Sequence, residues 1–251
     1  MRRPVVLETL LFVLVLVLVA LMNVPASWVA LRVAQTTGQK LLLTNSTGTL
    51  WHGSAEMALS AGPDALGVFP GRVSWRLAPG LKGLNFTLEA MDATAMSGSI
   101  SGTLGWSGGH LTPGALTLPA QVLTGWGAPF NTLRLEGQLK LRWEPLDWSY
   151  RNAAPRSLAS LTVEAEQMRS RLSPVAPLGQ YRLHLAWGPL GGKLDLETLS
   201  GPLMLSGQGA LANGRLGFDG QATASDALAP QLVGLLSILG KREGAITRLH
   251  Y

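Results

Sequence analysis

The chain begins with a continuous apolar run and then changes to an alternation of apolar and polar residues. Residues Val5–Met22 read VVLETLLFVLVLVLVALM, a run of about 18 residues with a single charge at Glu8. A helix of about 20 residues is needed to cross a hydrocarbon core of ~30 Å. The pattern therefore predicts a transmembrane helix over residues 5–22, preceded by a short cytoplasmic tail at residues 1–4.

The charges around this run predict its orientation. Arg2 and Arg3 precede it, and the next charge after Glu8 is Arg32. Basic residues stay on the cytoplasmic side, so Arg2 and Arg3 are expected at the inner membrane interface and the rest of the chain beyond the membrane. The alternative is a signal peptide that is cleaved after Ala26. The apolar run is longer than the usual 7–15-residue signal core, which favours a retained anchor.

A short juxtamembrane helix is predicted over residues 23–38. Pro25 suits the first helical position of the segment Pro25–Gln35, and Gly38 is expected to end it. Trp28 then falls where aromatic side chains gather at membrane interfaces.

From residue 39 onward, the apolar period becomes two. In Thr132–Glu144 the leucines and Trp143 fall on one face and the charged residues on the other, which predicts a strand with one buried face. A helix would scatter the same leucines around its axis. About a dozen such strands with short connections indicate antiparallel meander pairing. The same alternation occurs around Val73–Leu77, Leu84–Leu88, Ile100–Trp106 and Leu183–Trp187.

The end of the chain shows a hairpin and a helix. Leu203–Ala212 and Arg215–Ala224 are joined by Asn213-Gly214, the preferred two-residue turn. Asp226–Leu239 predicts a late helix with Asp226 as N-cap and Gly240 as terminator.

These patterns define the expected architecture. The fold class is mainly β, with one N-terminal transmembrane helix, a strongly twisted or curled antiparallel sheet (a half-barrel or sandwich-like) and a short C-terminal helix. The β domain spans 39–251, and a boundary at Asn152–Ser157 divides it into possible halves at 39–151 and 158–251. One-sided strands must cover their apolar face by curling, by pairing with another sheet or by taking up a ligand.

Composition excludes several classes of function. The chain has no cysteine, so it has no disulfide and no thiolate chemistry. Its formal net charge is +5, but the charged residues are scattered without a basic run, so a nucleic-acid partner is not expected.

No motif predicts catalysis, a metal or a cofactor. Gly105–Gly109 matches the G-x-S-x-G nucleophile pattern around Ser107, but Pro113 follows closely and a glycine-rich hairpin turn is the better interpretation. Gly188–Lys193 lacks the spacing of a phosphate loop. The four histidines, His52, His110, His184 and His250, have no second ligand at metal-like spacing. For His52 and His184, which fall on strands opposite a neighbouring tryptophan, solvent-facing positions are expected. Ser107 is therefore the only candidate catalytic residue for a hydrolase, and the sequence shows no paired carboxylates and no Ser/His arrangement to support it.

Tryptophan is frequent in this chain, at eight residues. Five tryptophans are predicted on apolar strand faces, either packed in a core or lining a hydrophobic groove for lipid or peptide. They are Trp51, Trp75, Trp106, Trp143 and Trp187.

Several segments together resemble a known family. Pro25-Ala26-Ser27-Trp28 follows the anchor, and Gly48–Ala55 reads GTLWHGSA. Val73–Leu77 reads VSWRL, and the chain closes with Leu235–Gly240 and a short strand over Ala245–Tyr251. This order and spacing resembles the type II secretion system protein N family.

The resemblance implies a single-pass inner-membrane protein with a periplasmic β domain. Such a protein is a non-enzymatic accessory of the machinery that moves folded proteins across the outer membrane of Gram-negative bacteria. Its expected partners are the inner-membrane platform or the secretin, with no cofactor. The alternative is a periplasmic lipid-binding or lipid-transfer groove, since the glycine-leucine strands are also similar to those of AsmA-like proteins.

Overall fold

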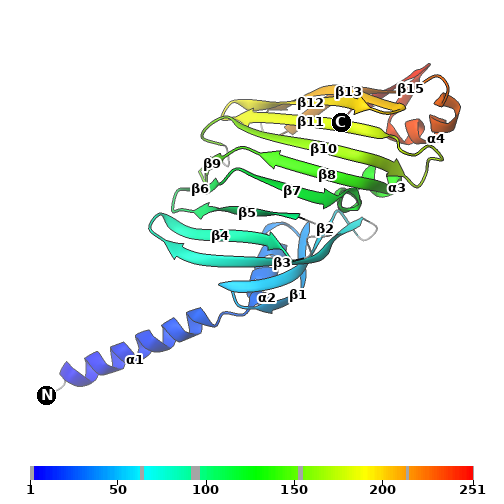
Figure 1. Ribbon diagram of the computed structural model, residues 1–251. Coiled ribbons are helices and arrows are strands. Elements are labelled where there is room, and N and C mark those ends of the chain that lie inside the picture. Colours follow the sequence, from blue (N-terminus) through cyan, green and yellow to red (C-terminus); the bar gives the residue numbers. More distant parts are fainter. Residues whose placement is uncertain (1–2, 63–64, 92–96, 152–154, 213–214, 251) are drawn as a thin grey trace.

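The computed structural model describes the backbone of residues 3–62, 65–91, 97–151, 155–212 and 215–250, with the side chains of 3–7, 212, 215 and 216 outside the description. Two helices begin it: α1 (Arg3–Met22) and α2 (Ala26–Thr36). α1 protrudes from the rest of the molecule, and α2 lies against the sheet (Figure 1). Within the described residues, none of the helices combines the length and the apolar character needed to cross a membrane.

α2 is the helix predicted over Pro25–Gln35. Pro25 occupies the N-cap in an extended conformation, one position before the place predicted for it. The helix ends at Thr36, and Gly38 follows with a φ of +60°. A positive φ suits glycine, which explains why the chain turns there into the first strand.

The rest of the described chain is dominated by one antiparallel sheet. Its strand order is β1-β2-β3-β4-β5-β7-β8-β10-β11-β12-β13-β14-β16-β15, with β6 paired to β5 and to β9. The predicted antiparallel meander is confirmed. The strands are β1 (Leu41–Gly48), β2 (His52–Ser60), β3 (Leu66–Gly80), β4 (Gly83–Ala90), β5 (Ser97–Leu104), β6 (Gly108–Leu111), β7 (Gly114–Pro119), β8 (Leu135–Trp143), β9 (Leu146–Ser149), β10 (Ala159–Ser170), β11 (Gly179–Gly188), β12 (Gly191–Ser200), β13 (Leu203–Ala212), β14 (Arg215–Ala224), β15 (Lys241–Glu243) and β16 (Ile246–His250).

The prediction of a strongly curled half-barrel is wrong. The sheet remains open, with β1 at one end of the strand order and β15 at the other. Helices cover much of the apolar face, so the sheet does not have to close on itself to shield that face. The covering elements are α2, η1 (Ala120–Trp126), α3 (Phe130–Leu133) and α4 (Ala229–Leu239).

Strand register sorts side chains into apolar and polar rows. On one face, Leu116, Leu141 and Val163 are direct neighbours, and the row continues through Leu183 and Leu196. We call this the apolar face. On the other, Lys140, Glu164, Arg182 and Glu197 stand side by side, and we call this the polar face. Cross-strand neighbours of this kind are the unit of sheet stabilisation.

Two hydrophobic clusters join the helices to the apolar face. The first contains Val122 of η1 together with Leu139, Met168 and Tyr181 of the sheet. The Tyr181 hydroxyl donates to the Leu203 carbonyl at 3.0 Å, and burial raises the pKa of this hydroxyl. The second cluster packs Leu232, Leu235 and Leu236 of α4 against Leu203, Ala222 and Leu249.

The chain between β7 and β8 differs from its prediction. The strand expected over Thr132–Glu144 begins only at Leu135, because Phe130–Leu133 form α3 and Arg134 takes a left-handed conformation with a φ of 45°. Leu133 is buried in the second cluster under α4, so tertiary packing overrides the alternation at this point.

The C-terminal predictions are largely confirmed. β13 pairs with β14 along their whole length, while the Asn213-Gly214 turn itself lies outside the described residues. α4 begins at Ala229 with Leu228 as N-cap, so the prediction of Asp226 as N-cap is wrong; Gly240 is the C-cap as predicted. Pro230 lies at the start of the helix, where the missing amide hydrogen costs little, and this moves the beginning of the helix past Asp226.

The predicted boundary between two halves falls inside this one sheet. Residues 152–154 lie outside the described chain. Before them β9 pairs with β6, and after them β10 pairs with β8. The division into two halves at Asn152–Ser157 remains a prediction.

Candidate functional site

The candidate catalytic and metal-binding residues are dispersed. His110 Nδ1 lies 2.9 Å from Asp147, His250 Nδ1 lies 2.6 Å from Asp219, and His184 lies 3.2 Å from the Thr162 hydroxyl. His52 is exposed on β2. Among the residues that the structure describes, no three His, Cys, Asp or Glu side chains are grouped to hold a metal ion.

Ser107 stands in a hairpin turn, as the glycine-rich pattern predicts. The Gly105 amide donates to the Gly108 carbonyl at 2.8 Å, which closes the turn between β5 and β6. The Ser107 hydroxyl accepts a hydrogen bond from Arg156 at 3.2 Å. A nucleophile elbow requires a helix directly after the serine, and here a strand follows, so the motif does not carry nucleophilic chemistry.

The carboxylates of the polar face pair with basic side chains. Lys140 bonds Glu166 at 2.8 Å, and Arg182 bonds Glu164 and Glu197 at 3.0 Å each. The guanidinium of Arg182 donates hydrogen bonds to Glu164 and Glu197, and these bonds raise its pKa, the bond to Glu164 having the larger effect. These groups are partly exposed to solvent, so each pair contributes little stability.

The predicted tryptophans occupy four kinds of environment. Trp75 is buried, and Trp143 and Trp187 are half-buried on their strands. Trp51 lies in the connection between β1 and β2. The prediction for Trp106 is wrong: its side chain is 98% exposed because Gly105 ends the strand alternation and the indole stands at a turn tip.

Each tryptophan on a strand pairs directly with a glycine on the neighbouring strand. The pairs are Trp75–Gly53, Trp143–Gly114, Trp148–Gly109 and Trp187–Gly192. A Cβ on Gly53 would lie 2.3 Å from the Trp75 ring, and one on Gly114 would lie 2.5 Å from the Trp143 ring. The glycines therefore provide the space in which the rings lie against the sheet. These contacts favour core packing over an open groove for Trp75 and Trp143.

Tryptophan side chains also connect α1 and α2 to the sheet. The Trp51 indole donates to the Leu21 carbonyl at the end of α1, at 2.9 Å. The Trp75 indole donates to the Leu50 carbonyl at 3.0 Å, and the Leu50 amide donates to the Val24 carbonyl at 2.8 Å. The GTLWHG segment thus forms the junction between the N-terminal helices and the β-sheet.

We expect Gly53→Ala to destabilise this junction. The added methyl group collides with the buried Trp75 ring, and overpacking of this kind costs roughly 1–3 kcal/mol. Thermal unfolding in detergent measures the effect as a lowered midpoint. Gly234→Ala is the matched control, since its Cβ meets nothing within 4 Å in α4 and it should stabilise the helix by roughly 0.5–1 kcal/mol. Equal midpoints for the two variants would contradict this packing.

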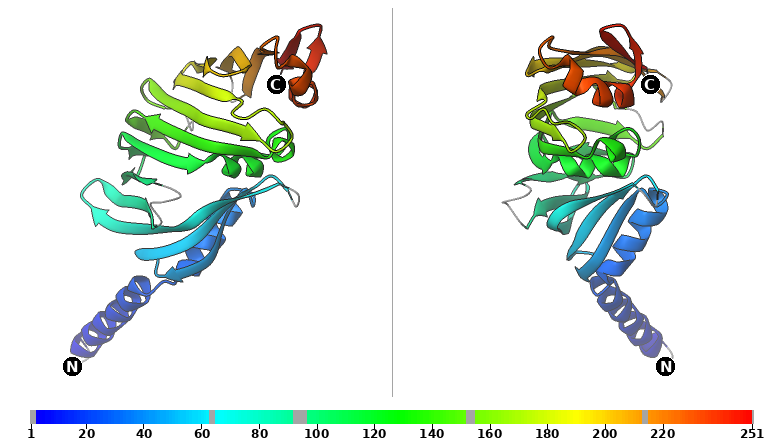
Figure 2. Two further views of the ribbon diagram at one scale, coloured as in Figure 1. Left: turned by 45° about the vertical axis from the view of Figure 1, so that its right-hand side comes forward. Right: turned by 90° about the vertical axis from the view of Figure 1, so that its right-hand side faces the viewer.

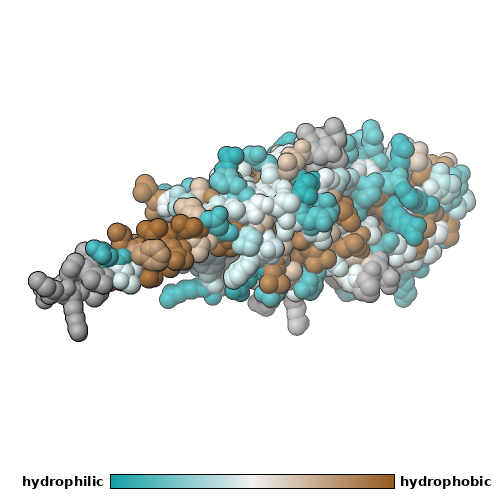
Figure 3. Space-filling view, turned by 90° about the horizontal axis from the view of Figure 1, so that it is seen from below, coloured by the Kyte–Doolittle hydropathy of each residue, from teal (hydrophilic) through white to brown (hydrophobic). Residues whose placement is uncertain are grey.

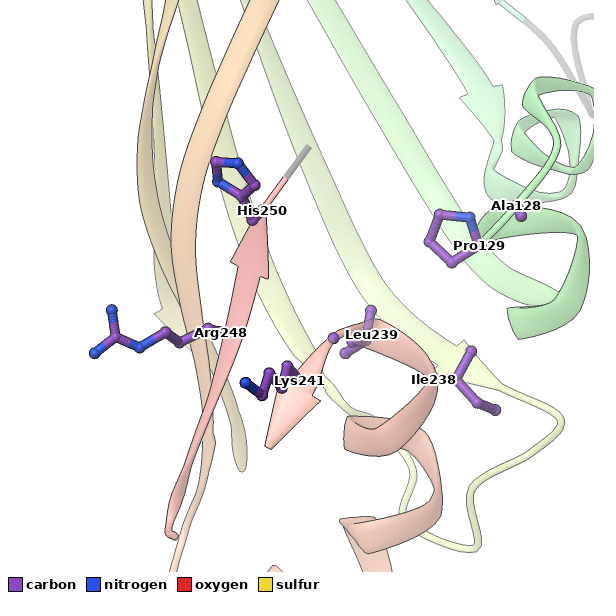
Figure 4. Close-up of a pocket in the computed structure, with 8 residues that line it drawn as sticks. Ala128, Pro129, Ile238, Leu239, Lys241, Arg248 and His250 are labelled. Atoms are coloured by element: carbon purple, nitrogen blue, oxygen red, sulfur yellow. The ribbon is translucent and has the colours of Figure 1, made fainter. Parts of the chain in front are cut away.

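Two cavities lie near the C-terminal strands. One, of about 510 Å³, lies between α4, β15 and the Ala128–Pro129 segment, with Ile238, Leu239 and Lys241 among its lining residues. Figure 4 shows Pro129 across an open space from Leu239 and His250. The described residues that line this cavity include no carboxylate, so they offer no carboxylate-based acid–base pair.

The second cavity is a wide groove of about 1430 Å³ over β12, β13, β14 and β16. Asp195, Glu197 and Asp219 line it together with Arg248 and His250. Its charges are already paired in part, because Glu197 bonds Arg182, Asp219 bonds His250 and Glu243 bonds Arg248. The groove resembles a solvated sheet surface more than a reaction centre.

The remaining interface predictions concern α1 and α2. Trp28 is 61% exposed on α2, which leaves it accessible. Arg2 lies outside the described residues, and the side chain of Arg3 is outside the description. Sequence reasoning missed the tryptophan–glycine pairs, because they depend on strand register. It also missed the exposed apolar side chains at the turns between strands. A Leu or Trp directly beside glycine or proline was the pattern that indicated such turns.

Comparison with known proteins gives one match. The family model for the type II secretion system (T2SS), protein N, matches residues 39–247. No curated protein and no solved structure matches the chain. The matched segment contains the junction, the whole sheet up to β16 and all of the helices that cover the apolar face except α2.

Proposed function

The chain belongs to the type II secretion system protein N family, and we propose that it acts as a non-catalytic accessory component anchored in the inner membrane with its sheet in the periplasm. The family match over residues 39–247 carries this proposal. The geometry is compatible with it, since the described residues form one broad open sheet with β1 and β15 as its edge strands.

The anchor is proposed from the apolar run Val5–Met22 in α1, which includes residues 5–7, whose side chains lie outside the described part of the chain. Its residues from Leu10 to Met22 expose large apolar side chains, which water solvates poorly. Figure 3 shows this surface as a brown stretch between the grey N-terminal residues and the sheet. The apolar run Val5–Met22 is the single-pass segment of the proposal, with Arg2 and Arg3 in the cytoplasm and Trp28 at the outer interface.

Retention of the anchor is supported by Ala26. This residue is 1% exposed and packs with Ala55 and Trp75 in a hydrophobic cluster. Cleavage after Ala26 would remove it from that cluster and would cut the backbone next to the Pro25–Thr49 bridge. A domain that needs Ala26 for packing is better explained by an anchor that stays attached.

The proposed partners are the inner-membrane platform, the secretin or both. β1 and β15 end the strand order, and edge strands carry backbone groups that another chain can pair with. β15 is short and its three residues are exposed, whereas β1 has eight residues. β1 is therefore the stronger candidate for strand addition.

The test is a mild-detergent purification of the full chain from envelope membranes, with bound proteins and lipids identified. A photo-crosslinker at Thr44 of β1 is expected to capture a secretion subunit, while one at Gln138 on the polar face of central β8 is the matched control. Capture of no secretion subunit at Thr44, in cells that assemble the machinery, would contradict the partner assignment.

A second candidate function is lipid binding along the apolar face. It rests on Leu161, Leu185 and Trp187, which are half-buried beyond the covering helices. Purified chain that carries stoichiometric phospholipid, lost in Leu185→Gln but kept in the polar-face variant His184→Gln, would support it. A chain without lipid would assign these residues to the core.

A further inference from the structure

Exposed apolar side chains occupy the turns at one end of the sheet. Leu81 lies in the β3–β4 turn, Trp106 in the β5–β6 turn and Leu190 in the β11–β12 turn. Tyr150 and Leu158 flank the connection from β9 to β10. We call these five residues the tip row. Alternate turns of a meander lie at the same end, and Figures 1 and 2 show these hairpins along one side of the molecule.

Three members of the tip row are almost fully exposed, and Tyr150 and Leu158 are 53% and 74% exposed. Leu81, Trp106 and Leu190 are 108%, 98% and 102% exposed, so their side chains touch almost nothing in the chain. They contribute no packing to the fold. The covering elements η1, α3 and α4 gather at the opposite end of the strands (Figure 2). A row of apolar tips marks an interaction surface better than single exposed residues do.

Basic side chains accompany the tips. Lys82 follows Leu81, Arg151 follows Tyr150, Arg156 precedes Leu158, and Lys193 lies three residues after Leu190; all four are exposed. None of the four forms an ion pair with another residue that the structure describes, whereas the basic side chains Lys140 and Arg182 on the polar face do.

Acidic groups at this end are fewer. Glu144 is exposed, and Asp147 is paired with His110. The tip row therefore combines apolar and aromatic tips with a net positive charge. An acidic surface into which apolar groups can insert complements both properties.

We propose that the tip row docks on the surface of an anionic phospholipid bilayer. Trp106 and Tyr150 have the amphipathic rings that settle at the headgroup level, and Leu81 and Leu190 reach the acyl boundary. Each Lys or Arg near an anionic leaflet strengthens binding about fivefold. α1 leaves the sheet toward the same side as the tip row (Figures 1 and 2), so one membrane can meet both.

The inference rests on the proposed function in one respect, that α1 holds the chain at a membrane. It adds an orientation, because a single membrane-crossing helix does not by itself fix the tilt of the attached sheet relative to the leaflet. Docking of the tip row would hold the strands end-on to the leaflet. The sheet edges at β1 and β15 would then face sideways, toward neighbouring subunits.

The test uses the full chain, whose lack of cysteine permits single-site labelling. Ser107→Cys and Pro189→Cys place a polarity-sensitive fluorophore beside the intact tips Trp106 and Leu190. Ser173→Cys places it beside Leu172, which is 46% exposed in the turn between β10 and β11 at the opposite end, and is the matched control. Each variant is reconstituted into vesicles of phosphatidylcholine with or without phosphatidylglycerol.

We expect a blue shift and quenching by spin-labelled lipid at positions 107 and 189 in vesicles with phosphatidylglycerol, and neither at position 173. The substitutions Lys82→Gln, Arg151→Gln, Arg156→Gln and Lys193→Gln are each expected to weaken this docking about fivefold. Flotation of the vesicles reports α1 separately. Two results would overturn the tip-row proposal: protein that floats with the vesicles while the fluorophores at positions 107 and 189 show no blue shift, or an equal blue shift at all three positions. Either result would leave the proposal that α1 is the anchor unaffected.

Discussion

Arginine in place of both Leu14 and Leu18 is expected to release the chain from the membrane and to abolish its contribution to export. Both residues lie in the exposed apolar part of α1. A charged residue near the centre of a membrane helix costs about 3 kcal/mol, and two cost about 6 kcal/mol. Carbonate extraction of envelope membranes measures the release, with the chain moving from the pellet to the supernatant.

Leu14→Val with Leu18→Val is the matched control, since it keeps the apolar character of the helix and should leave the chain in the membrane. If the double-arginine chain is still resistant to extraction, α1 is not the anchor. If it is released and secretion remains normal, the anchor is not needed for function.

Leu232→Asp is expected to detach α4 from the sheet and to unfold the C-terminal strands. Leu232 is 0% exposed and packs with Leu203, Ala222 and Leu249 beneath α4. Truncation of a buried leucine to alanine costs about 2–5 kcal/mol, and a buried carboxylate without a partner costs more. Thermal unfolding of the purified chain should show a lower midpoint, and limited proteolysis should cut first near α4.

Gln231→Asp tests the same helix one residue earlier on an exposed position, where a carboxylate near the helix N-terminus is favourable. It should leave the midpoint unchanged or slightly raised. If the Leu232→Asp and Gln231→Asp variants have the same unfolding midpoint, α4 contributes little to the stability of the fold.

The alternation of residues predicts the strands well and their covering poorly. Leu139, Leu141 and Trp143 fall on the apolar face as expected, because a period of two leaves one arrangement in which all three are shielded. The same alternation cannot say what shields them. The short helix η1 (Ala120–Trp126) supplies Val122 to the first cluster. A helix of this length is too short to produce a recognisable periodicity in the sequence.

Two other errors have local causes. The alternation places Leu133 with the strand leucines, but Leu133 lies in the helical turn α3 and is buried in the second cluster, where packing against α4 decides its conformation. Trp106 continues the alternation of β5 in sequence, yet Gly105 and Gly108 close a turn around it. Glycines on both sides were the signal that the strand had ended.

The tryptophan–glycine pairs required the register of neighbouring strands. Gly53 and Trp75 are 22 positions apart in sequence, and their contact follows from the pairing of β2 with β3. The frequency of tryptophan predicts a core or a groove and does not identify the residues beside the rings. In the structure, a Cβ on Gly53 would collide with the Trp75 ring, so this position requires a residue without a side chain.

Export by cells that lack this chain tests the central claim most directly, namely that it is a non-catalytic component of type II secretion. The amount of a folded type II substrate in the medium and of a Sec-dependent protein in the periplasm is measured after deletion and after complementation. We predict that deletion lowers the first and leaves the second intact, and that both the unchanged chain and Ser107→Ala restore export. Normal export after deletion, in a strain without a redundant copy, would contradict the account.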